Sequence, residues 1–587
     1  MSQNGPHPTT GAGRRPALPV KLDGVHHRAL ETARNRVLVS GIVFAVAFLL
    51  IAARLVELSV FGPAGDPGYV ALSAPDRTPN RGDIVDRNGV LLATSLPTTS
   101  LFADPSEVLD PEDAARRLAE VMPEFDPHRV FAKLTAPSRF KWLHRNLTPA
   151  EQYAVNGLGI PGLGFVHEQR RLYPHGRTAA HVLGFTDIDG RGIAGVESSF
   201  DARLAAGEDL RLAIDIRVQD LLREELAAAV AEFQALGAAG VVADVRTGEV
   251  LAMVSLPDFD ANAPASAPSD ARFNRAAMGV YEMGSTFKLF TAAMAIDSGT
   301  ATLKDRYDAR QPLRVARYTI RDHRPEARWL TVPEVVIHSS NIGAAKMALD
   351  VGTETQRDYL GRFGLLTPAA IELPEVGSPL VPDRWREVTT MTVAFGHGVA
   401  VSPVQLTQAV AAVAGGGILR PTTLLAAPAG SSGERVLSAE SSEAVRTLMR
   451  LVVRRGTGRR AEVPGYRVGG KTGTAEKLVD GRYSDGAVVS SFIGAFPIDD
   501  PRYVVLAVFD EPKGTAETRH HATGGWIAAP VVGQVVQRMA PLMGLAPAAI
   551  EDDGPPVRRP VERRRKPFLV AVKEAIDDAR GRRLASY

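Results

Sequence analysis

The chain has 587 residues, a formal net charge of +2 and no cysteine. This length exceeds that of one ordinary domain, so the sequence predicts several domains. The small net charge gives no basis for nucleic-acid binding, and the lack of cysteine excludes a disulfide framework and a thiolate metal site.

The N-terminal part of the chain predicts a membrane anchor. Residues 1–36 are basic and too poor in apolar side chains to fold alone, so we expect a cytoplasmic tail. Residues 37–53 carry no charge and approach the ~20 residues that a membrane helix needs, and the apolar side chains up to Leu58 complete a span of residues 37–58. A cleaved signal peptide is the alternative, but its only small-x-small site, Ala45–Ala47, lies in mid-run. The preceding arginines predict an uncleaved single-pass anchor, with the cytoplasm on the N-terminal side and all residues after Phe61 outside.

The next segment, residues 62–217, reads as a strand-rich module. Within it, Arg81–Ala93 predicts a β-hairpin, because Asn88 and Gly89 form a preferred two-residue turn. The hairpin is expected to pair two short apolar strands.

A serine three residues before a lysine is the first polar motif after residue 217. Ser285 and Lys288 precede an apolar run that ends before Gly299, so we expect a helix that places both side chains on one face. A neutral lysine in contact with a serine hydroxyl can take its proton, and burial together with a second cation would lower the lysine pKa. The alternative is an ordinary helix N-terminus with a capping serine and a solvated lysine.

Two further polar stretches follow downstream. Ser339 and Asn341 lie at a predicted helix–helix junction, where a hydroxyl and an amide can relay a proton and hold a substrate amide. Lys471, Thr472, Gly473 and Thr474 lie on a predicted glycine-rich strand that a peptide backbone could approach closely. The alternatives are a capping turn and a loose glycine hairpin.

Residues 218–545 predict one α/β domain around these stretches. The patterns indicate a hairpin from residues 239–245 and 250–254, then an antiparallel meander of the Lys471 strand, 488–496 and 503–509. Apolar helices are expected before and after the meander. His520 and His521 lie in a loop without a carboxylate pattern, which argues against a metal site.

The C-terminal segment, residues 546–587, is rich in proline and arginine. A short apolar stripe from Phe568 to Ile576 falls at helical spacing. A solvated tail is favoured over a docking helix, because so short a stripe gives a weak amphipathic face.

In this order, Ser-x-x-Lys, Ser-x-Asn and Lys-Thr-Gly resemble the three active-site motifs of penicillin-binding proteins and serine β-lactamases. Arg81–Ala93 is similar to a signature of class B penicillin-binding proteins, and Arg171–Pro174 and Gly192–Glu197 are similar to further segments of that family. In that family these segments brace a non-catalytic pedestal, so their charged residues are expected to form structural ion pairs. Residues 62–217 leave no room for a glycosyltransferase domain, which argues against the bifunctional class A type.

Further segments are similar to the division-specific branch of class B, the FtsI type. They are Ser339–Ala348, Ala394–Gly398 and Gly524–Val531. The resemblance implies a membrane-anchored pedestal followed by a penicillin-binding transpeptidase domain, an antiparallel sheet flanked by helices. One departure is Met283, where the family usually has proline; this puts the rigidity of the helix entry in doubt rather than the chemistry.

The resemblance also implies a reaction and its partners. Neutral Lys288 takes the proton of Ser285, and Ser285 attacks the terminal D-alanyl-D-alanine of a peptidoglycan stem peptide to form an acyl-enzyme. The N–H groups of Ser285 and Thr474 would stabilise the oxyanion, and Lys471, Thr472 and Thr474 would hold the substrate carboxylate. No metal or cofactor is expected.

The implied partners and setting follow from the same family. The partners are donor and acceptor stem peptides, β-lactams, a membrane-embedded septal glycosyltransferase and other division proteins. The setting is the bacterial inner membrane, with the catalytic domain in the periplasm.

Three alternatives stay open. One is an elongation-type transpeptidase. Another is a carboxypeptidase or β-lactamase-like hydrolase on the same scaffold, in which water takes the acyl group. The last is a non-enzymatic division scaffold, for which the pedestal and tails would suffice.

Overall fold

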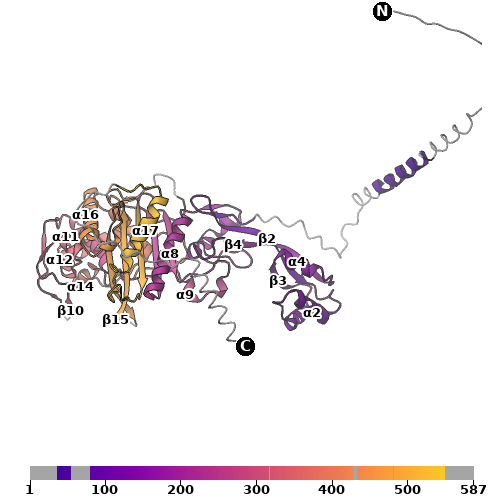
Figure 1. The fold of residues 1–587 in the computed structure, drawn as a ribbon, viewed down its shortest axis with the longest axis horizontal. Coiled ribbons are helices and arrows are strands. Elements are labelled where there is room, and N and C mark those ends of the chain that lie inside the picture. The colour runs from indigo at the N-terminus through magenta and orange to yellow at the C-terminus, as the bar shows by residue number, and fades with distance from the viewer. Residues whose placement is uncertain are drawn as a thin grey trace, which may run out of the picture. The chain divides into compact units, whose positions relative to one another are not determined.

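The structure is a computed structural model that describes residues 36, 38–53, 80–315, 318–426, 432–479 and 482–548 (Figure 1). The chain divides into two compact units, Met1–Thr78 and Pro79–Tyr587. In the first unit, residues 38–53 form a helix. Within the described part of the chain, no helix combines the length and apolar character needed to cross a membrane. The predicted tails and residues 54–61 lie outside the described residues, except for 36 and 546–548.

The first part of the second unit is built around the long strand β2 (Leu91–Ala103). The predicted hairpin is confirmed: β1 (Ile84–Val85) pairs antiparallel with β2, and the turn glycine Gly89 has a φ of 85°. On the far side of β1, β5 (Leu210–Arg211) runs parallel to it. β2 also pairs with β3 (Lys141–Leu147) and β4 (Leu163–Leu172).

This segment holds more helix than the prediction of a strand-rich module allowed. Three of its helices each begin with a proline after an Asp or Thr N-cap, a strong local start signal: α2 (Pro111–Val121), α3 (Pro127–Leu134) and α4 (Pro149–Asn156). They pack with β2 and β3 around a small core of their own that includes Leu101, Leu118 and Leu147. Three short helices follow: α5 (Ala180–Leu183), α6 (Gly195–Ser199) and α7 (Asp201–Ala205).

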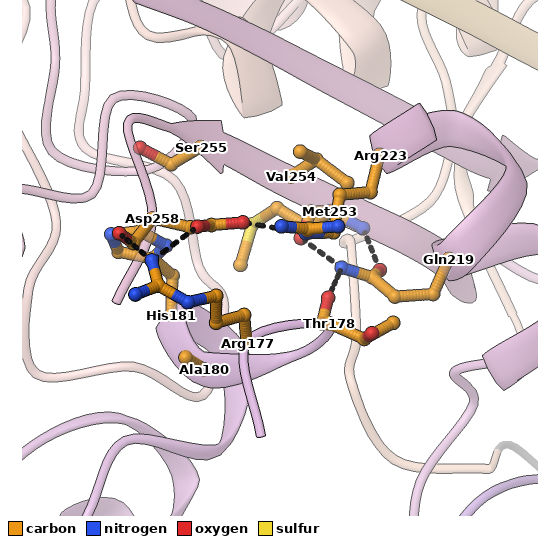
Figure 2. Close-up of a pocket in the computed structure, with 10 residues that line it drawn as sticks. All are labelled: Arg177, Thr178, Ala180, His181, Gln219, Arg223, Met253, Val254, Ser255 and Asp258. Atoms are coloured by element: carbon orange, nitrogen blue, oxygen red, sulfur yellow. Dashed lines mark hydrogen bonds and ion pairs between the residues drawn. The ribbon is translucent and has the colours of Figure 1, made fainter. Parts of the chain in front are cut away.

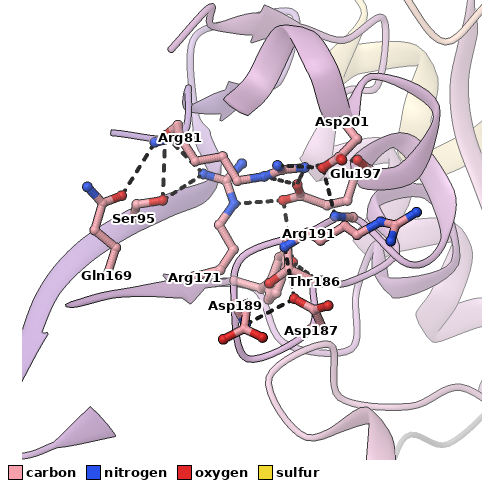
Figure 3. Close-up of polar contacts among 12 residues, drawn as sticks. Arg81, Ser95, Gln169, Arg171, Thr186, Asp187, Asp189, Arg191, Glu197 and Asp201 are labelled. Carbon is pink, nitrogen blue, oxygen red and sulfur yellow. Dashed lines mark hydrogen bonds and ion pairs between the residues drawn. The ribbon is translucent and has the colours of Figure 1, made fainter. Parts of the chain in front are cut away.

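A buried ion-pair cluster holds the base of this segment together (Figure 3). The Glu197 carboxylate, fully buried, lies 2.6 Å from the Arg81 guanidinium and 2.7 Å from the Arg171 guanidinium. Arg81 also pairs with Asp201 at 2.7 Å. A buried carboxylate between two guanidiniums satisfies charges that would otherwise be costly to bury. The expected structural ion pairs are therefore present.

The second sheet is fully antiparallel, in the order β14-β15-β16-β6-β7. The predicted hairpin and meander are confirmed by its strands: β6 (Gly237–Asp244), β7 (Val250–Leu256), β14 (Gly469–Val479), β15 (Arg482–Phe496) and β16 (Tyr503–Asp510). Alternate residues of β16 enter two different cores, Val504 and Leu506 one of them, Val505 and Phe509 the other. Both faces of the sheet are thus covered.

Helices cover the two faces of this sheet. One face packs against α8 (Ile216–Phe233) and α17 (Ala528–Leu542), which lie side by side (Figure 1). The other face packs against a mainly helical lobe whose longer members are α10 (Lys288–Asp297), α12 (Asn341–Val351), α13 (Thr353–Arg362), α15 (Pro403–Ala414) and α16 (Ala439–Arg455). The lobe also contains α11 (Val332–Ile337), α14 (Glu387–Val393) and the short strands β8 (Arg306–Asp308) and β11 (Trp329–Thr331).

Polar contacts join the two parts of the second unit. The Asp258 carboxylate forms ion pairs with Arg177 at 3.2 Å and with Arg223 at 2.5 Å. These three residues line a small cavity together with Gln219 (Figure 2). The Gln219 amide donates to the carbonyl oxygens of Thr178 and Met253, both at 2.8 Å. The polar residues that line this cavity therefore connect residues 177–178 of the first part to residues 219–258 of the second part.

Candidate active site

Ser285 lies in a 3₁₀ turn, Gly284–Phe287, that leads directly into α10. The predicted helix is present, with a tighter first turn than expected. Side chains three residues apart are nearly eclipsed in 3₁₀ geometry, so Ser285 and Lys288 face each other. The Lys288 Nζ lies 2.8 Å from the Ser285 Oγ. At the other end, Gly299 takes the left-handed conformation, with a φ of 74°, and ends the helix as predicted.

The Lys288 ammonium group is buried among oxygen atoms. Its side chain is 1% exposed, and Nζ also donates to the Ser339 carbonyl at 2.9 Å and to the Asn341 Oδ1 at 2.7 Å. Burial, assisted by the positive charge of Lys471, holds the pKa of Lys288 well below its usual value. This shift favours the neutral amine, the form that can accept a proton from a serine.

Lys471 reaches the same place from β14. Its side chain is 0% exposed, and Nζ donates to the Ser339 Oγ at 3.1 Å and to the Thr472 carbonyl at 3.1 Å. Burial lowers the pKa of Lys471 to about 7. Two buried lysines thus surround one hydroxyl, which the sequence pattern alone did not require.

The Ser339 hydroxyl is set by the short connection between α11 and α12. Ser339 takes a left-handed φ of 60°, and Ser340 caps α12 by accepting the Gly343 N–H. The predicted helix–helix junction is therefore present. Asn341, at the first position of α12, uses its amide nitrogen to donate to the Arg321 carbonyl at 3.0 Å, which turns its oxygen toward Lys288.

Asp322 is a buried residue of this site that the sequence reasoning missed. Its carboxylate accepts the Ser340 hydroxyl at 2.7 Å and the Ile342 N–H at 3.0 Å, so it holds the α12 end of the connection that carries Ser339. Its negative charge also raises the pKa of Lys288, against the larger effects of burial and Lys471. A lone aspartate in a loop gives no periodic signal by which it could have been found.

The predicted Lys-Thr-Gly strand forms an edge beside Ser285. Thr472 is buried and its hydroxyl lies 2.7 Å from that of Thr457. Thr474 is partly exposed, and its Oγ accepts the Gly524 N–H at 3.1 Å. A Cβ at Gly473 would lie 2.5 Å from the Met283 carbonyl, so only glycine allows the strand to approach the serine turn.

A second close approach joins this turn to two other segments. Gly284 has a φ of 53°, and a Cβ there would lie 2.5 Å from the Thr474 carbonyl oxygen. Gly396, with a φ of 83°, would place a Cβ 2.0 Å from the Gly284 carbonyl. The segment around Gly396 was quoted for its resemblance, but its contact with the serine turn was not foreseen.

The structure brings all eight predicted residues together. Hydrogen bonds link Ser285, Lys288, Ser339, Asn341 and Lys471, and β14 adds Thr472, Gly473 and Thr474. Among the described residues, no group of three or more His, Cys, Asp and Glu could hold a metal ion. His521, one of the two loop histidines, stacks on Trp526 with ring centroids 5.5 Å apart.

The arrangement is suited to acyl transfer. A half-exposed serine hydroxyl contacts a buried lysine of lowered pKa, and a second buried lysine lies beside a strand edge that can pair with a peptide. Groups of the kinds that a nucleophile, a base and a carboxylate site require are thus present together.

Comparisons with known proteins agree with this geometry. Residues 238–537 match the family described as the penicillin binding protein transpeptidase domain, and residues 76–211 match the penicillin-binding protein dimerisation domain. The chain is similar to the probable peptidoglycan D,D-transpeptidase FtsI of Caulobacter vibrioides, with 43% identity over 83% of this chain and 85% of that protein. It is similar to the peptidoglycan D,D-transpeptidase FtsI of Escherichia coli K12, with 32% identity over 89% of this chain and 94% of that protein. Among solved structures, penicillin binding protein 3 of Mycobacterium tuberculosis, complexed with aztreonam, has a TM-score of 0.64 and 26% identity, covering 81% of this chain and 98% of that one.

Proposed function

The chain belongs to the class B penicillin-binding proteins of the FtsI type, and on that premise we propose that it is the peptidoglycan D,D-transpeptidase that cross-links stem peptides at the division septum. It acts through a serine acyl-enzyme and is inhibited by β-lactams. The observation that carries this function is the 2.8 Å contact between the Ser285 Oγ and the buried Lys288 Nζ.

The first half of the reaction is acylation. Lys288, neutral, takes the Ser285 proton, and the Ser285 oxygen attacks the carbonyl of the penultimate D-alanine. The proton then passes to the leaving amine; Ser339 lies 3.1 Å from Lys288 and offers a relay. D-Alanine departs, and the acyl group stays on Ser285.

The second half reverses the proton movements. The amine of a neighbouring stem peptide attacks the acyl carbonyl and gives up a proton to Lys288, and the Ser285 oxygen recovers its own. Lys471, Thr472 and Thr474 bind the carboxylate of the substrate. The N–H groups of Ser285 and Thr474 stabilise the oxyanion.

We propose two domain boundaries and a membrane setting in addition. The pedestal spans residues 62–217 and the transpeptidase domain residues 218–545, a division supported by the two family matches. The uncharged run 37–53 supports a single-pass anchor, which would place the catalytic domain in the periplasm beside the septal glycosyltransferase and other division proteins.

Intact-mass spectrometry after mixing with penicillin tests the function. The wild-type chain should carry one stable adduct, and Ser285→Ala should carry none. A transpeptidase keeps water from its acyl-enzyme until an amine arrives, so the adduct should outlast many turnovers. Rapid loss of the adduct with continuing drug hydrolysis would assign the chain to the hydrolases instead.

A further inference from the structure

A cluster of arginines lies next to the predicted carboxylate site. The Thr457 hydroxyl contacts that of Thr472 at 2.7 Å, and a Cβ at Gly525 would lie 2.5 Å from the Thr457 carbonyl. Arg459 and Arg460 follow Thr457 closely in the chain, and Trp526 follows Gly525 directly. The backbone that supports Thr472 therefore also carries these three side chains.

The cluster is held in a defined arrangement. The Arg460 guanidinium lies 3.3 Å from the centroid of the Trp526 indole, and His521 stacks on the same ring. Stacking fixes the plane of a guanidinium while its N–H edge stays available to a ligand. Arg519 contributes from the loop between β16 and α17, where it takes a left-handed φ of 52°. We call Arg459, Arg460 and Arg519 the arginine cluster.

The three arginines of the cluster lie close enough together for their charges to act on one another. Partial burial and the positive charges of Arg459 and Arg519 lower the pKa of Arg460. All three side chains are exposed. Cations held close together at a solvent-accessible surface favour an anion, and guanidiniums match a planar carboxylate with paired hydrogen bonds.

The proposed reaction indicates which carboxylate could bind to the arginine cluster. D-Alanine leaves from the end of the donor where Lys471, Thr472 and Thr474 hold its carboxylate. The acceptor amine replaces that leaving amine on the same carbonyl, so the second stem peptide must enter from the same end. Under this mechanism, side chains next to Thr472 would lie beside the incoming acceptor.

We propose that the arginine cluster, with Trp526 as its platform, is an acceptor subsite that binds a carboxylate of the incoming stem peptide. This inference rests on the proposed transpeptidase function and adds to it the recognition of the second substrate. Arg460 and Arg519 are specificity-determining residues that act on binding of the acceptor, and acylation of Ser285 by the donor does not depend on them.

Cross-linking kinetics with the full-length chain test this subsite. Arg460→Gln and Arg519→Gln are compared with Arg357→Gln, a matched loss of an exposed arginine on α13. Each protein is given an acceptor stem peptide with free carboxylates and the same peptide with its carboxylates amidated. We expect the KM for the free acceptor to rise about tenfold in the two cluster variants, as for loss of a charged hydrogen bond, with little change in kcat and none in the control. For the wild-type chain, the KM for the amidated acceptor should be about tenfold higher than for the free acceptor. For the cluster variants, the two KM values should be the same.

The rate of penicillin acylation separates this inference from the function on which it rests. It should be the same in all four proteins. Unchanged acceptor KM values in the cluster variants, with normal acylation, would overturn the subsite and leave the transpeptidase function intact. Slower acylation in the cluster variants would also overturn it, because the cluster would then serve the donor. A wild-type chain that fails to acylate would instead remove the proposed function.

Discussion

Lys288 and Lys471 share one hydrogen-bond acceptor, the Ser339 hydroxyl, which lies 3.1 Å from each Nζ. Two ammonium groups that share one acceptor in a buried site repel each other, and loss of a proton from one of them relieves the repulsion. The pKa of Lys288 is lowered by burial and by Lys471. The second lysine thus favours the neutral form of the first, the form that the proposed mechanism needs.

Arginine substitutions should separate the roles of the two lysines. Lys288→Arg should abolish acylation by penicillin although it keeps a positive charge, because a guanidinium does not lose its proton in a protein. Lys471→Arg should be milder, since that position needs a cation that faces a carboxylate. Stopped-flow acylation rates measure both effects. Equal losses at the two positions would remove the assignment of distinct roles.

The buried charge of Lys471 should make stability depend on pH. Its pKa is about 7 in the folded chain, below the ordinary lysine value of 10.5, so the unfolded chain holds the extra proton between these two values. The wild-type chain should therefore lose stability as the pH falls from about 10.5 to about 7, and change little from this source below that. Lys471→Met removes this penalty, so its stability advantage should grow over the same range.

Thermal unfolding across that pH range measures the difference. Lys304→Met is the matched control, because it removes an exposed lysine instead of a buried one. A constant gap between Lys471→Met and the wild-type chain would contradict the lowered pKa.

Substitution of Gly284 should damage the site through the backbone. An alanine Cβ there would lie 2.5 Å from the Thr474 carbonyl oxygen, and the φ of 53° adds strain. Gly299→Ala is the matched control, since Gly299 has a φ of 74° but no atom within 4 Å of the added Cβ. We expect Gly299→Ala to cost about 1 kcal/mol of unfolding free energy and to acylate normally. Gly284→Ala should cost more and should slow acylation; similar behaviour of the two variants would show that the approach of β14 is not tight.

Glu197→Gln should weaken the pedestal without touching the chemistry. It leaves the buried guanidiniums of Arg81 and Arg171 without their shared anion, and breaking a buried pair in this way costs about 3–5 kcal/mol. Asp201→Asn should cost less, because that carboxylate is 34% exposed. Denaturant unfolding gives both values. Penicillin acylation of the folded Glu197→Gln chain should match the wild-type rate, and a large loss there would connect the pedestal to catalysis.

Removal of residues 1–60 should give a soluble protein that still binds penicillin. The described part of the second unit contains all eight predicted site residues, so the proposed anchor serves only to position them. Sedimentation without detergent and penicillin labelling measure the two properties. A truncated chain that stays insoluble would indicate a second membrane-binding surface.

The sequence predicted those parts of the site that local spacing determines. Ser285 and Lys288 are three residues apart on one helix, and the glycines around Lys471 mark a strand that something approaches closely. Asp322 was not predicted because its contacts with Ser340 and Ile342 depend on the three-dimensional fold, which no local sequence pattern indicates. The shared hydroxyl of Ser339 escaped for the same reason. The helices α2, α3 and α4 could have been predicted, because each starts with an Asp-Pro or Thr-Pro pair that is typical of a helix N-terminus. The nearby hairpin pattern favoured the prediction of strands instead.

The glycine contacts around the serine turn also limit how the protein can adapt to β-lactams. Gly284, Gly396 and Gly473 meet neighbouring backbone where no side chain fits, and Gly524 would place a Cβ 2.4 Å from the Gly473 carbonyl. At these positions no other side chain can be introduced without moving the backbone of the serine turn. Under the proposed function, substitutions that reduce drug sensitivity are therefore expected at other positions of the chain.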